Sequence, residues 1–408
     1  MLSMKYLQRC RWSSFLWLAI LASCGGGVGQ DPAISTALVG DTRQDNNYTR
    51  FGDGAPAEKF RWIVLRGVRG GLLTPPLYLD RYRYAMLTDR GALVIAEGDD
   101  VLHQFNFPNG EHPYPAIIAD SSGTLYFITT RGILHAVGGD GVERWSKNLR
   151  PADSNAIVGF SHPLGMADGV IAGATTGRLT RFGNDGSQRW SVEFGAGIGP
   201  LLCQVNGQLT VALTHNDYSQ SDSLITIDAA TGARQMVAAL PGMRVVAGPA
   251  AIGSVTLVGV ARRADDGSRQ PSLLAVANGK VLWNRPLRLM PRGISGDGEG
   301  NIYISGTGTT EEFTGGMLVS FDSAGNQRWE KLFESELTSA AAVSGSYLYV
   351  VSRREGRTGL FTYTHEGQFA AFAPVINLPD VSSRITISPI AEPLLVAADT
   401  CVVLRGGD

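Results

Sequence analysis

The sequence predicts an all-β fold in which short antiparallel strands are organised in repeated units. A short phrase recurs along the chain, as in Asp140-Gly141-Val142-Glu143-Arg144-Trp145, and its turn glycine appears seven times. The copies lie at Gly110, Gly141, Gly186, Gly232, Gly279, Gly325 and Gly367. The intervals between these glycines are 31, 45, 46, 47, 46 and 42 residues. A period in the forties with β-type content is typical of the blades of a β-propeller.

The composition agrees with many short strands joined by tight turns. The chain of 408 residues is 44% hydrophobic and 18% charged, contains 51 glycines and shows no long helical periodicity. Its formal net charge is −2. We predict no nucleic-acid partner, because the sequence has no basic region of the kind that binds a phosphate backbone.

The unit from 115 to 147 illustrates the four predicted strands. Residues 116–118, 125–128 and 133–137 form the first three strands, and the fourth begins at Val142. Glycine, aspartate and serine separate the strands, as tight turns between antiparallel strands require. We therefore expect each blade to be a four-stranded antiparallel meander.

The first strand of several units begins with small residues or proline. Examples are Gly199-Pro200, Gly248-Pro249 and Ala340-Ala341-Ala342. Small side chains suit strands that converge near the axis of a propeller, where backbones approach closely.

The two ends of the chain indicate how the ring closes. Near the C-terminus, residues 394–398 and 401–404 supply two strands, and the chain stops just before a fourth one. The missing strand is predicted at residues 58–66, where Arg61-Trp62 copies the Arg-Trp pair of the other phrases. Residues 57–408 then form an eight-bladed propeller, with 352 residues or 44 per blade. Pairing the N-terminal strand with the C-terminal strands would remove the exposed sheet edges.

A large side chain commonly stands four residues after each turn glycine. The residues at this position are Tyr114, Trp145, Trp190, Met236, Trp283, Trp329 and Ala371, with Trp62 in the split copy. We interpret the position as a packing site between neighbouring blades, because a repeated position is first of all a structural one. The alternative is a ring of aromatic side chains that stack on a ligand.

The phrase resembles the tryptophan-docking repeat of the PQQ-like, or quinoprotein-type, β-propeller family. Residues 226–232 are the closest copy, although Met236 replaces the tryptophan, and residues 274–283 are nearly as close. The resemblance covers most of residues 57–408. It implies the fold, but it implies little about activity, because many functions share this scaffold.

Residues 1–23 are predicted to be an export signal. Lys5, Arg9 and Arg11 form a positive region, and the apolar run 15–21 is too short to span a bilayer. Removal of this segment would leave 32 basic and 37 acidic residues, a balance of −5.

Leu21-Ala22-Ser23-Cys24 resembles the lipobox of bacterial lipoproteins. The resemblance implies that Cys24 is lipidated and becomes the new N-terminus, with acyl chains that hold the protein at a membrane. Gly25 at the next position implies sorting to the outer membrane. Residues 24–56 are rich in Gly, Asp, Asn and Thr and are predicted to be a flexible tether.

The sequence offers no catalytic constellation, and we predict no enzyme, cofactor or metal site. Quinoprotein dehydrogenases of the resembled family carry adjacent cysteines, whereas Cys10, Cys24, Cys203 and Cys401 are well separated. A Cys203–Cys401 disulfide is not expected, and both are interpreted as core residues. The histidines show no metal-ligand spacing. Residues 297–301 weakly suggest a calcium loop, but turn chemistry explains them.

The favoured function is a non-enzymatic protein-interaction scaffold, lipid-anchored at the periplasmic face of the outer membrane. In signal, anchor, size and blade count the chain resembles BamB-like outer-membrane lipoproteins, which implies another envelope protein as its partner. Residues 216–223 and 265–269 are candidate contact loops. The alternative is a small-ligand-binding or enzymatic propeller that uses the axial channel. A purely structural surface lipoprotein is a third option.

Overall fold

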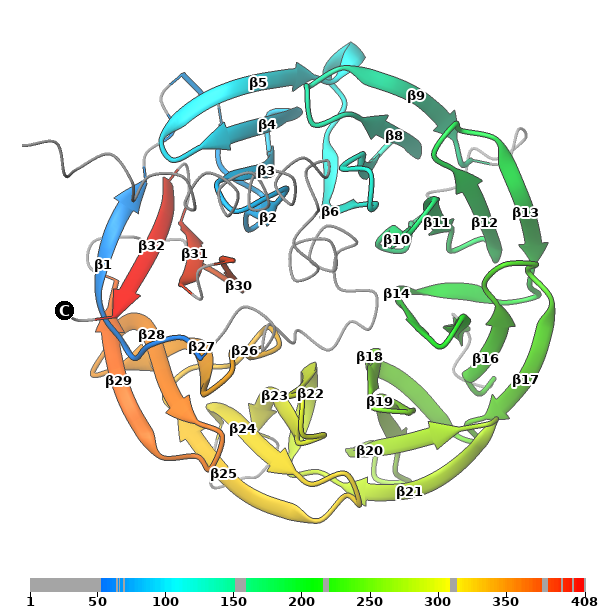
Figure 1. Cartoon of the computed structure of the whole chain (residues 1–408). Helices are drawn as coiled ribbons and strands as arrows, with labels where there is room; N and C mark the ends of the chain where they lie inside the picture. Colours follow the sequence, from blue (N-terminus) through cyan, green and yellow to red (C-terminus); the bar gives the residue numbers. More distant parts are fainter. Residues whose placement is uncertain are drawn as a thin grey trace, which may run out of the picture.

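The computed structural model describes residues 53–63, 65, 67–68, 70–150, 159–215, 220–308, 314–375, 381–389, 392–397 and 400–406. The predicted export signal, Cys24 and most of the predicted tether lie outside these residues. The described residues form eight four-stranded antiparallel sheets, which Figure 1 shows arranged around a common centre. The fold is therefore an all-β propeller, as the sequence predicts.

The first four sheets follow one another along the chain. The first contains β2 (Leu77–Tyr78), β3 (Arg83–Thr88), β4 (Ala92–Glu97) and β5 (Asp100–Asn106). The second contains β6 (Pro113–Ala119), β7 (Leu125–Thr129), β8 (Ile133–Val137) and β9 (Glu143–Asn148). The third contains β10 (Leu164–Met166), β11 (Gly169–Gly173), β12 (Arg178–Gly183) and β13 (Gln188–Glu193). The fourth contains β14 (Gly197–Val205), β15 (Gln208–Thr214), β16 (Ser223–Asp228) and β17 (Arg234–Ala239).

The remaining four sheets bring the chain back to its start. The fifth contains β18 (Met243–Ile252), β19 (Val255–Arg263), β20 (Arg269–Ala277) and β21 (Lys280–Pro286). The sixth contains β22 (Leu289–Gly296), β23 (Ile302–Gly308), β24 (Gly316–Phe321) and β25 (Gln327–Phe333). The seventh contains β26 (Ala342–Val343), β27 (Tyr347–Arg354), β28 (Arg357–Thr364) and β29 (Phe369–Pro374). The eighth contains β30 (Val381–Ile387), β31 (Pro393–Ala397), β32 (Thr400–Gly406) and β1 (Ala57–Ile63).

The core lies between the sheets. Central strands such as β4 and β7 are buried along nearly their whole length, because neighbouring sheets cover both of their faces. The fourth strands, such as β9, are mostly exposed and form the outer rim. One apolar cluster joins the third and fourth sheets and another joins the fifth and sixth. Each sheet is thus stabilised by burial against its neighbours.

Strand β1 pairs antiparallel with β32, and Trp62 lies opposite Val402. The predicted pairing of the N-terminal segment with the end of the chain is confirmed. The register differs from the prediction in one respect. In the other fourth strands, a register shift directly precedes the residue at the tryptophan position, as at Trp190. In β1 the shift directly precedes Lys59, so Lys59 takes the position that tryptophan takes elsewhere. Trp62 lies three residues beyond that position.

Gly110 does not mark a blade turn, and the prediction for this copy is wrong. It ends a short 3-10 helix, η2 (Pro108–Gly110), and Tyr114 lies in the inner strand β6 of the next sheet. The fourth strand of the first sheet is β5, and its register shift directly precedes His103. His103 therefore occupies the position that tryptophan occupies elsewhere.

No helix in the described part of the chain has the length and apolar character needed to cross a bilayer.

The last residues of the segment predicted as tether pack against the seventh sheet. The carbonyl oxygen of Asp53 accepts hydrogen bonds from the Ser344 hydroxyl at 2.8 Å and the Ser346 amide at 3.0 Å. The carbonyl oxygen of Ala55 accepts a hydrogen bond from the Tyr349 hydroxyl at 2.9 Å. The N-terminal segment therefore contacts two neighbouring sheets, since β1 follows immediately.

The β1–β32 pairing can be tested with a cross-strand disulfide. Arg61 and Val403 are directly opposite, and paired residues in antiparallel strands have the Cα separation that a disulfide needs. We expect the Arg61→Cys, Val403→Cys double variant to cross-link on oxidation and to unfold at a higher denaturant concentration. Non-reducing electrophoresis and denaturation measure the two effects.

The control combines Arg61→Cys with Val281→Cys, whose exposed side chain lies on β21 of the fifth sheet. This pair should not cross-link within one chain. Equal cross-linking of both pairs, or none with Val403→Cys, would contradict the pairing.

Candidate functional site

The tryptophans of the repeat contact the turn of the following sheet. The indole Nε1 of Trp145 donates to the Asn184 carbonyl at 2.8 Å, and that of Trp190 donates to the Ala229 carbonyl at 3.1 Å. Trp329 donates in the same way to the His365 carbonyl at 3.0 Å. Each donor and acceptor belong to consecutive sheets. These contacts agree with a packing role for the position, although the same side chains remain partly accessible at several copies.

The turn glycines lie directly on these indole rings. A Cβ atom added to Gly232 would lie 2.8 Å from Trp190, and one added to Gly186 would lie 2.8 Å from Trp145. A Cβ atom added to Gly325 would lie 2.9 Å from Trp283, and one added to Gly367 would lie 2.7 Å from Trp329. At Gly141 the neighbouring side chain is His103, at 2.8 Å. Gly279 lies in the Asn278-Gly279 turn before β21, with a positive φ of 67°.

A buried aspartate organises the first turn of the second sheet and of the sixth sheet. Both carboxylate oxygens of Asp297 accept hydrogen bonds, from the amides of Glu299 and Asn301, from the Asn301 side chain and from the Tyr303 hydroxyl at 2.8 Å. Asp120 accepts from the Tyr126 hydroxyl at 2.7 Å in the same arrangement. A calcium ion would need carboxylate oxygens that these turns already use. Turn chemistry therefore explains residues 297–301.

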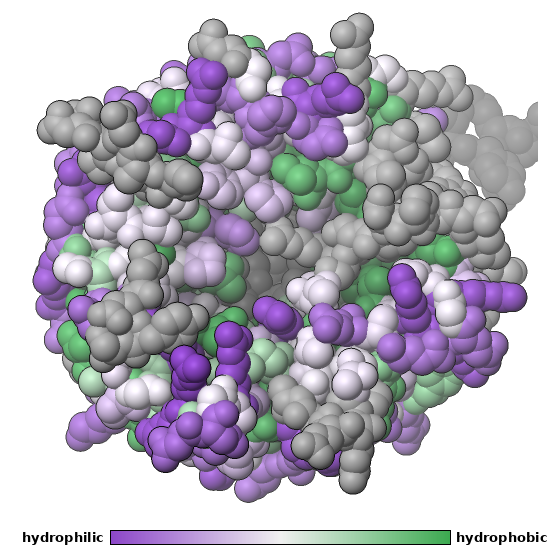
Figure 2. All heavy atoms as spheres, turned by 180° about the vertical axis from the view of Figure 1, so that it is seen from behind, coloured by the Kyte–Doolittle hydropathy of each residue, from purple (hydrophilic) through white to green (hydrophobic). Residues whose placement is uncertain are grey.

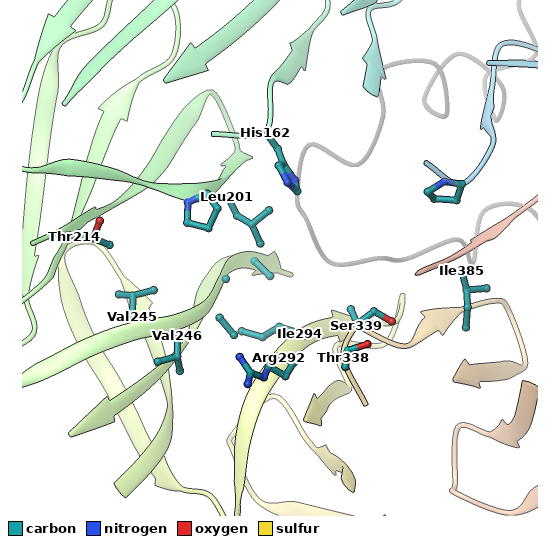
Figure 3. Close-up of a pocket in the computed structure, with 17 residues that line it drawn as sticks. His162, Leu201, Thr214, Val245, Val246, Arg292, Ile294, Thr338, Ser339 and Ile385 are labelled. Carbon is teal, nitrogen blue, oxygen red and sulfur yellow. The ribbon is translucent and has the colours of Figure 1, made fainter. Parts of the chain in front are cut away.

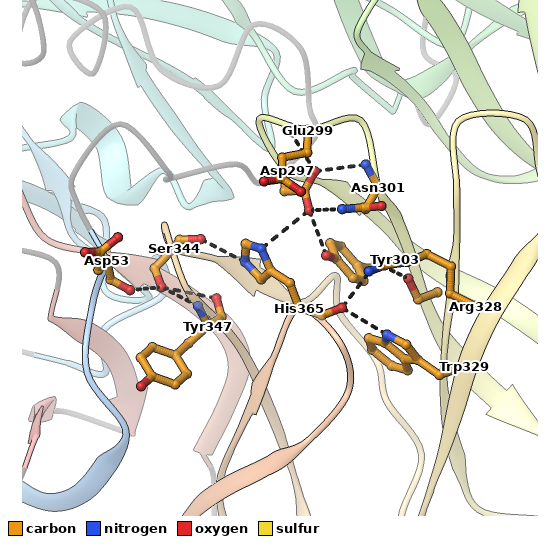
Figure 4. A network of polar contacts seen from close by, with 11 residues as sticks. Asp53, Asp297, Glu299, Asn301, Tyr303, Arg328, Trp329, Ser344, Tyr347 and His365 are labelled. Atoms are coloured by element: carbon orange, nitrogen blue, oxygen red, sulfur yellow. Dashed lines mark hydrogen bonds and ion pairs between the residues drawn. The ribbon is translucent and has the colours of Figure 1, made fainter.

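Asp297, His365 and Ser344 lie together but do not form a nucleophilic triad (Figure 4). His365 Nδ1 is 3.5 Å from Asp297 Oδ2, and its Nε2 donates to the backbone carbonyl of Ser344 at 3.1 Å. The Ser344 hydroxyl instead donates to the Asp53 carbonyl. A general base must contact the hydroxyl that it activates, so this network joins the sixth and seventh sheets without supplying a nucleophile.

His135 lies in the core, in strand β8 (Ile133–Val137). The side chain is 2% exposed, and its ring stacks on Phe127 with the centroids 5.1 Å apart. Nδ1 donates to Glu143 at 2.6 Å, and Nε2 is 3.6 Å from a carboxylate oxygen of buried Glu111. Glu111, next to η2, and Glu143, on β9, lie on either side of the His135 imidazole, so the three side chains connect the η2 segment with the second sheet.

The described residues line an axial pocket of about 470 Å³ where the inner strands converge (Figure 3). Its walls are small or apolar, with Leu201 from β14, Val246 from β18 and Ile294 from β22. His162 and Arg292 are its basic residues, and no acidic residue is among the described residues that line it. From behind, the surface is hollowed at the centre of the ring (Figure 2).

Close backbone approach explains the small residues of the inner strands. A Cβ atom at Gly293 would lie 2.2 Å from the Cα atom of Ala340, which precedes the inner strand of the next sheet. A larger residue could not be accommodated there without moving the backbone. The prediction that inner strands need small residues near the axis is confirmed at this position.

No metal or thiol chemistry is evident in the part of the chain that the structure describes. There, no three His, Cys, Asp or Glu side chains gather in a way that could hold a metal ion. Cys203 is buried in β14. Cys401 lies in β32.

Comparison with known proteins identifies the family. The model of the family described as outer membrane protein assembly factor BamB matches residues 130–368, more than half of the chain. The chain belongs to the BamB family. A search of curated proteins finds no match.

Solved structures similar to this member of the BamB family are also propellers. BamB from Moraxella catarrhalis superimposes with a TM-score of 0.59 and 15% identity, over 85% of this chain and 96% of that chain. The C-terminal WD40 domain of Sif2 has a TM-score of 0.61 at 10% identity, over 86% and 99% of the two chains. Saccharomyces cerevisiae Sqt1 has a TM-score of 0.58 at 11% identity, over 87% and 100%. At these identities the similarity establishes the fold alone.

The contact between glycine and indole can be tested with a matched pair of substitutions. Gly232 and Gly207 have nearly equal positive φ angles, 76° and 75°, but only Gly232 faces an indole ring. We expect Gly207→Ala to cost about 1–2 kcal/mol of unfolding free energy from backbone strain. Gly232→Ala should cost about 1–3 kcal/mol more, because the methyl group overpacks against Trp190. Denaturant titration at constant m-value measures both.

Equal losses in the two variants would show that the backbone angle alone matters. The Gly232→Ala, Trp190→Phe double variant should recover part of the extra cost, because the smaller ring leaves more room.

The buried tyrosines predict a loss of stability at alkaline pH. Burial raises the pKa of Tyr349 to about 12, and burial with a neighbouring aspartate raises the pKa of Tyr126 and Tyr303. Since the folded pKa exceeds the unfolded value of 10.0, this contribution is complete below pH 10 and is lost as the pH rises. We expect the denaturation midpoint to be nearly constant up to about pH 10 and to fall between about pH 10 and about pH 12. The fall should be smaller for Tyr126→Phe and unchanged for Tyr82→Phe, an exposed control.

Proposed function

We propose that this protein is a lipid-anchored periplasmic scaffold that binds another envelope protein and acts in outer-membrane protein assembly. The single observation that carries the proposal is the family match over residues 130–368. The family description names an assembly factor of the outer membrane, and BamB from Moraxella catarrhalis shares the fold over most of both chains.

The proposed scaffold is a closed, eight-bladed ring spanning residues 57–408. Support comes from the eight four-stranded sheets and from the pairing of β1 with β32 in the eighth sheet. A ring closed in this way has no free strand edge at its ends and presents its loops on a rigid frame. Rigid loops bind a partner with little loss of conformational entropy.

The outer rim provides apolar contact area. Large hydrophobic side chains that are about half exposed lie on the fourth strands of four consecutive sheets. They are Val237, Val281, Leu282, Leu332 and Phe369. With Leu102 on β5 of the first sheet, they give the outer rim exposed apolar area that another protein can contact.

A non-enzymatic role is supported by how the polar clusters are used. The carboxylates of Asp120 and Asp297 are engaged in turns, and His365 contacts a backbone carbonyl. Each of these groups holds neighbouring segments together. None is presented to the axial pocket, whose only charged lining residue among those described is Arg292, apart from the titratable His162.

Membrane attachment is proposed through Cys24 after removal of residues 1–23, with residues 24–52 as the tether. The contacts of Asp53 and Ala55 with the seventh sheet support a tether that ends there, a few residues before the predicted boundary at 56. Several acyl chains on one cysteine would anchor the domain almost permanently.

The second candidate is a small-ligand-binding propeller. The axial pocket of about 470 Å³ favours it, because this volume is in the range of small-molecule sites. Arg292 and His162 would select an anionic group.

The scaffold proposal is tested by affinity capture of the full chain from membranes. We expect the wild-type chain to remain with the outer-membrane fraction and to recover outer-membrane assembly proteins. Cys24→Ser should release the chain from the membrane but still bind the same proteins in detergent extracts. Recovery of a small molecule alone, with no envelope protein, would favour the second candidate instead.

A further inference from the structure

The fifth sheet departs from the regular repeat at one end. Strands β18, β19 and β20 have nine or ten residues, whereas the corresponding strands of the third sheet have three to six. The additional residues extend the β19–β20 hairpin and the start of β18. Beside this extension lies a cavity of about 700 Å³.

Four arginines line this cavity, and only one of them is neutralised by a described acidic residue. Arg244 pairs with buried Asp222 at 2.8 Å, and Asp222 also accepts hydrogen bonds from the amides of His215 and Val245. The others are Arg262, Arg263 and Arg269, all exposed. No described acidic side chain lies within ion-pair distance of these three. Asp222 is the single acidic residue among the described cavity residues.

The arrangement of the arginines is unfavourable for the folded protein by itself. Arg263 and Arg269 are directly opposite each other in the β19–β20 pair, and like charges at such positions destabilise a sheet. The seventh sheet has the same pair in its hairpin, Arg354 opposite Arg357. There Arg354 lies 3.9 Å from Glu355 and packs over Phe369, which offsets its charge. The turn of the fifth-sheet hairpin contains Asp265 and Asp266, but neither forms an ion pair with Arg263 or Arg269. The two guanidinium groups can therefore accept an external anion.

The cavity continues into the axial pocket. The two share Thr214, Val245 and Val246 as lining residues. Figure 3 shows Arg292 of β22 extending toward Val246, at the junction of the two. The shared floor is apolar on β18, and positive charge lies at both ends. We define this continuous surface, from Arg269 to Arg292, as the basic groove.

We propose that the basic groove binds an extended acidic peptide segment of a partner protein. The proposal rests on the scaffold function and names the chemistry of its partner. An extended chain directs alternate side chains to opposite sides, so apolar residues can lie on Val245 and Val246 while carboxylates reach the arginines. A concave groove admits a single chain but not a flat bilayer surface. Guanidinium groups bind carboxylates with two parallel hydrogen bonds.

The test measures binding of a defined peptide to the full chain. The probe is a fluorescein-labelled peptide in which glutamate alternates with valine and leucine, and fluorescence anisotropy reports binding. We expect the Arg262→Glu, Arg263→Glu, Arg269→Glu variant to bind at least about tenfold more weakly, through loss of charge complementarity. Added salt should weaken wild-type binding.

The matched control places the same charge change on the corresponding hairpin of the seventh sheet. Arg353→Glu, Arg354→Glu, Arg357→Glu alters three exposed arginines of β27 and β28 and should leave peptide binding unchanged. Unchanged denaturation curves would show that both variants fold. Equal weakening in the two variants, or equal binding of a peptide with glutamine in place of glutamate, would overturn the proposal.

Two further measurements are needed. One distinguishes the peptide from other anionic ligands, and the other distinguishes the groove proposal from the scaffold proposal. Displacement of the peptide by millimolar inorganic phosphate, or binding to phosphatidylglycerol vesicles without peptide binding, would assign the groove to another ligand and overturn the proposal. If the groove variant loses the peptide and also loses envelope proteins in affinity capture, both proposals are supported. Capture of those proteins by a wild-type chain that does not bind the peptide would overturn the groove alone.

Discussion

The structure depends on one repeated contact, an indole ring of one sheet lying on the turn glycine of the next. A four-stranded sheet of short strands is too small to be stable alone, and its apolar faces must be covered. The indole of Trp190 covers Gly232 and donates to Ala229, so a single side chain joins the sheets by packing and by hydrogen bonding. The contact recurs at Trp145 with Gly186, at Trp283 with Gly325 and at Trp329 with Gly367, so each of these indoles joins two consecutive sheets.

The same constraint explains why polar clusters that look catalytic are structural. Asp297 resembles a calcium ligand by sequence and a triad member by position, yet its oxygens are used by its own turn and by Tyr303. The Asp120–Tyr126 pair repeats the arrangement in the second sheet. Function is better sought where a sheet departs from the repeat. The extended β19–β20 hairpin is such a place, since it adds arginines that no described acidic residue neutralises.

Much of the fold could be predicted, because strand, turn and repeat signals are local. The four strands of the second sheet and the partners at the chain ends lie where the pattern indicated. The prediction of a blade turn at Gly110 is wrong for the first sheet, because its last hairpin turns at Gly98 and carries His103 in place of tryptophan. The spacing from Gly98 to Gly141, 43 residues, fits the repeat better than that from Gly110. The register shift that directly precedes His103, as it precedes tryptophan in other sheets, shows that His103 takes the tryptophan position. A register shift is a property of paired strands, so it cannot be seen in the sequence alone.

The sequence by itself determined the class of fold, the blade period and the matching of its two ends, because turn residues and alternating apolar residues act over a few positions. Tertiary structure decided which distant residues meet. Ser344 binds the carbonyl of Asp53 across 291 positions of the chain, and the basic groove joins arginines of the fifth and sixth sheets. Such contacts follow from how sheets are placed around an axis, and no local pattern in the chain encodes that placement.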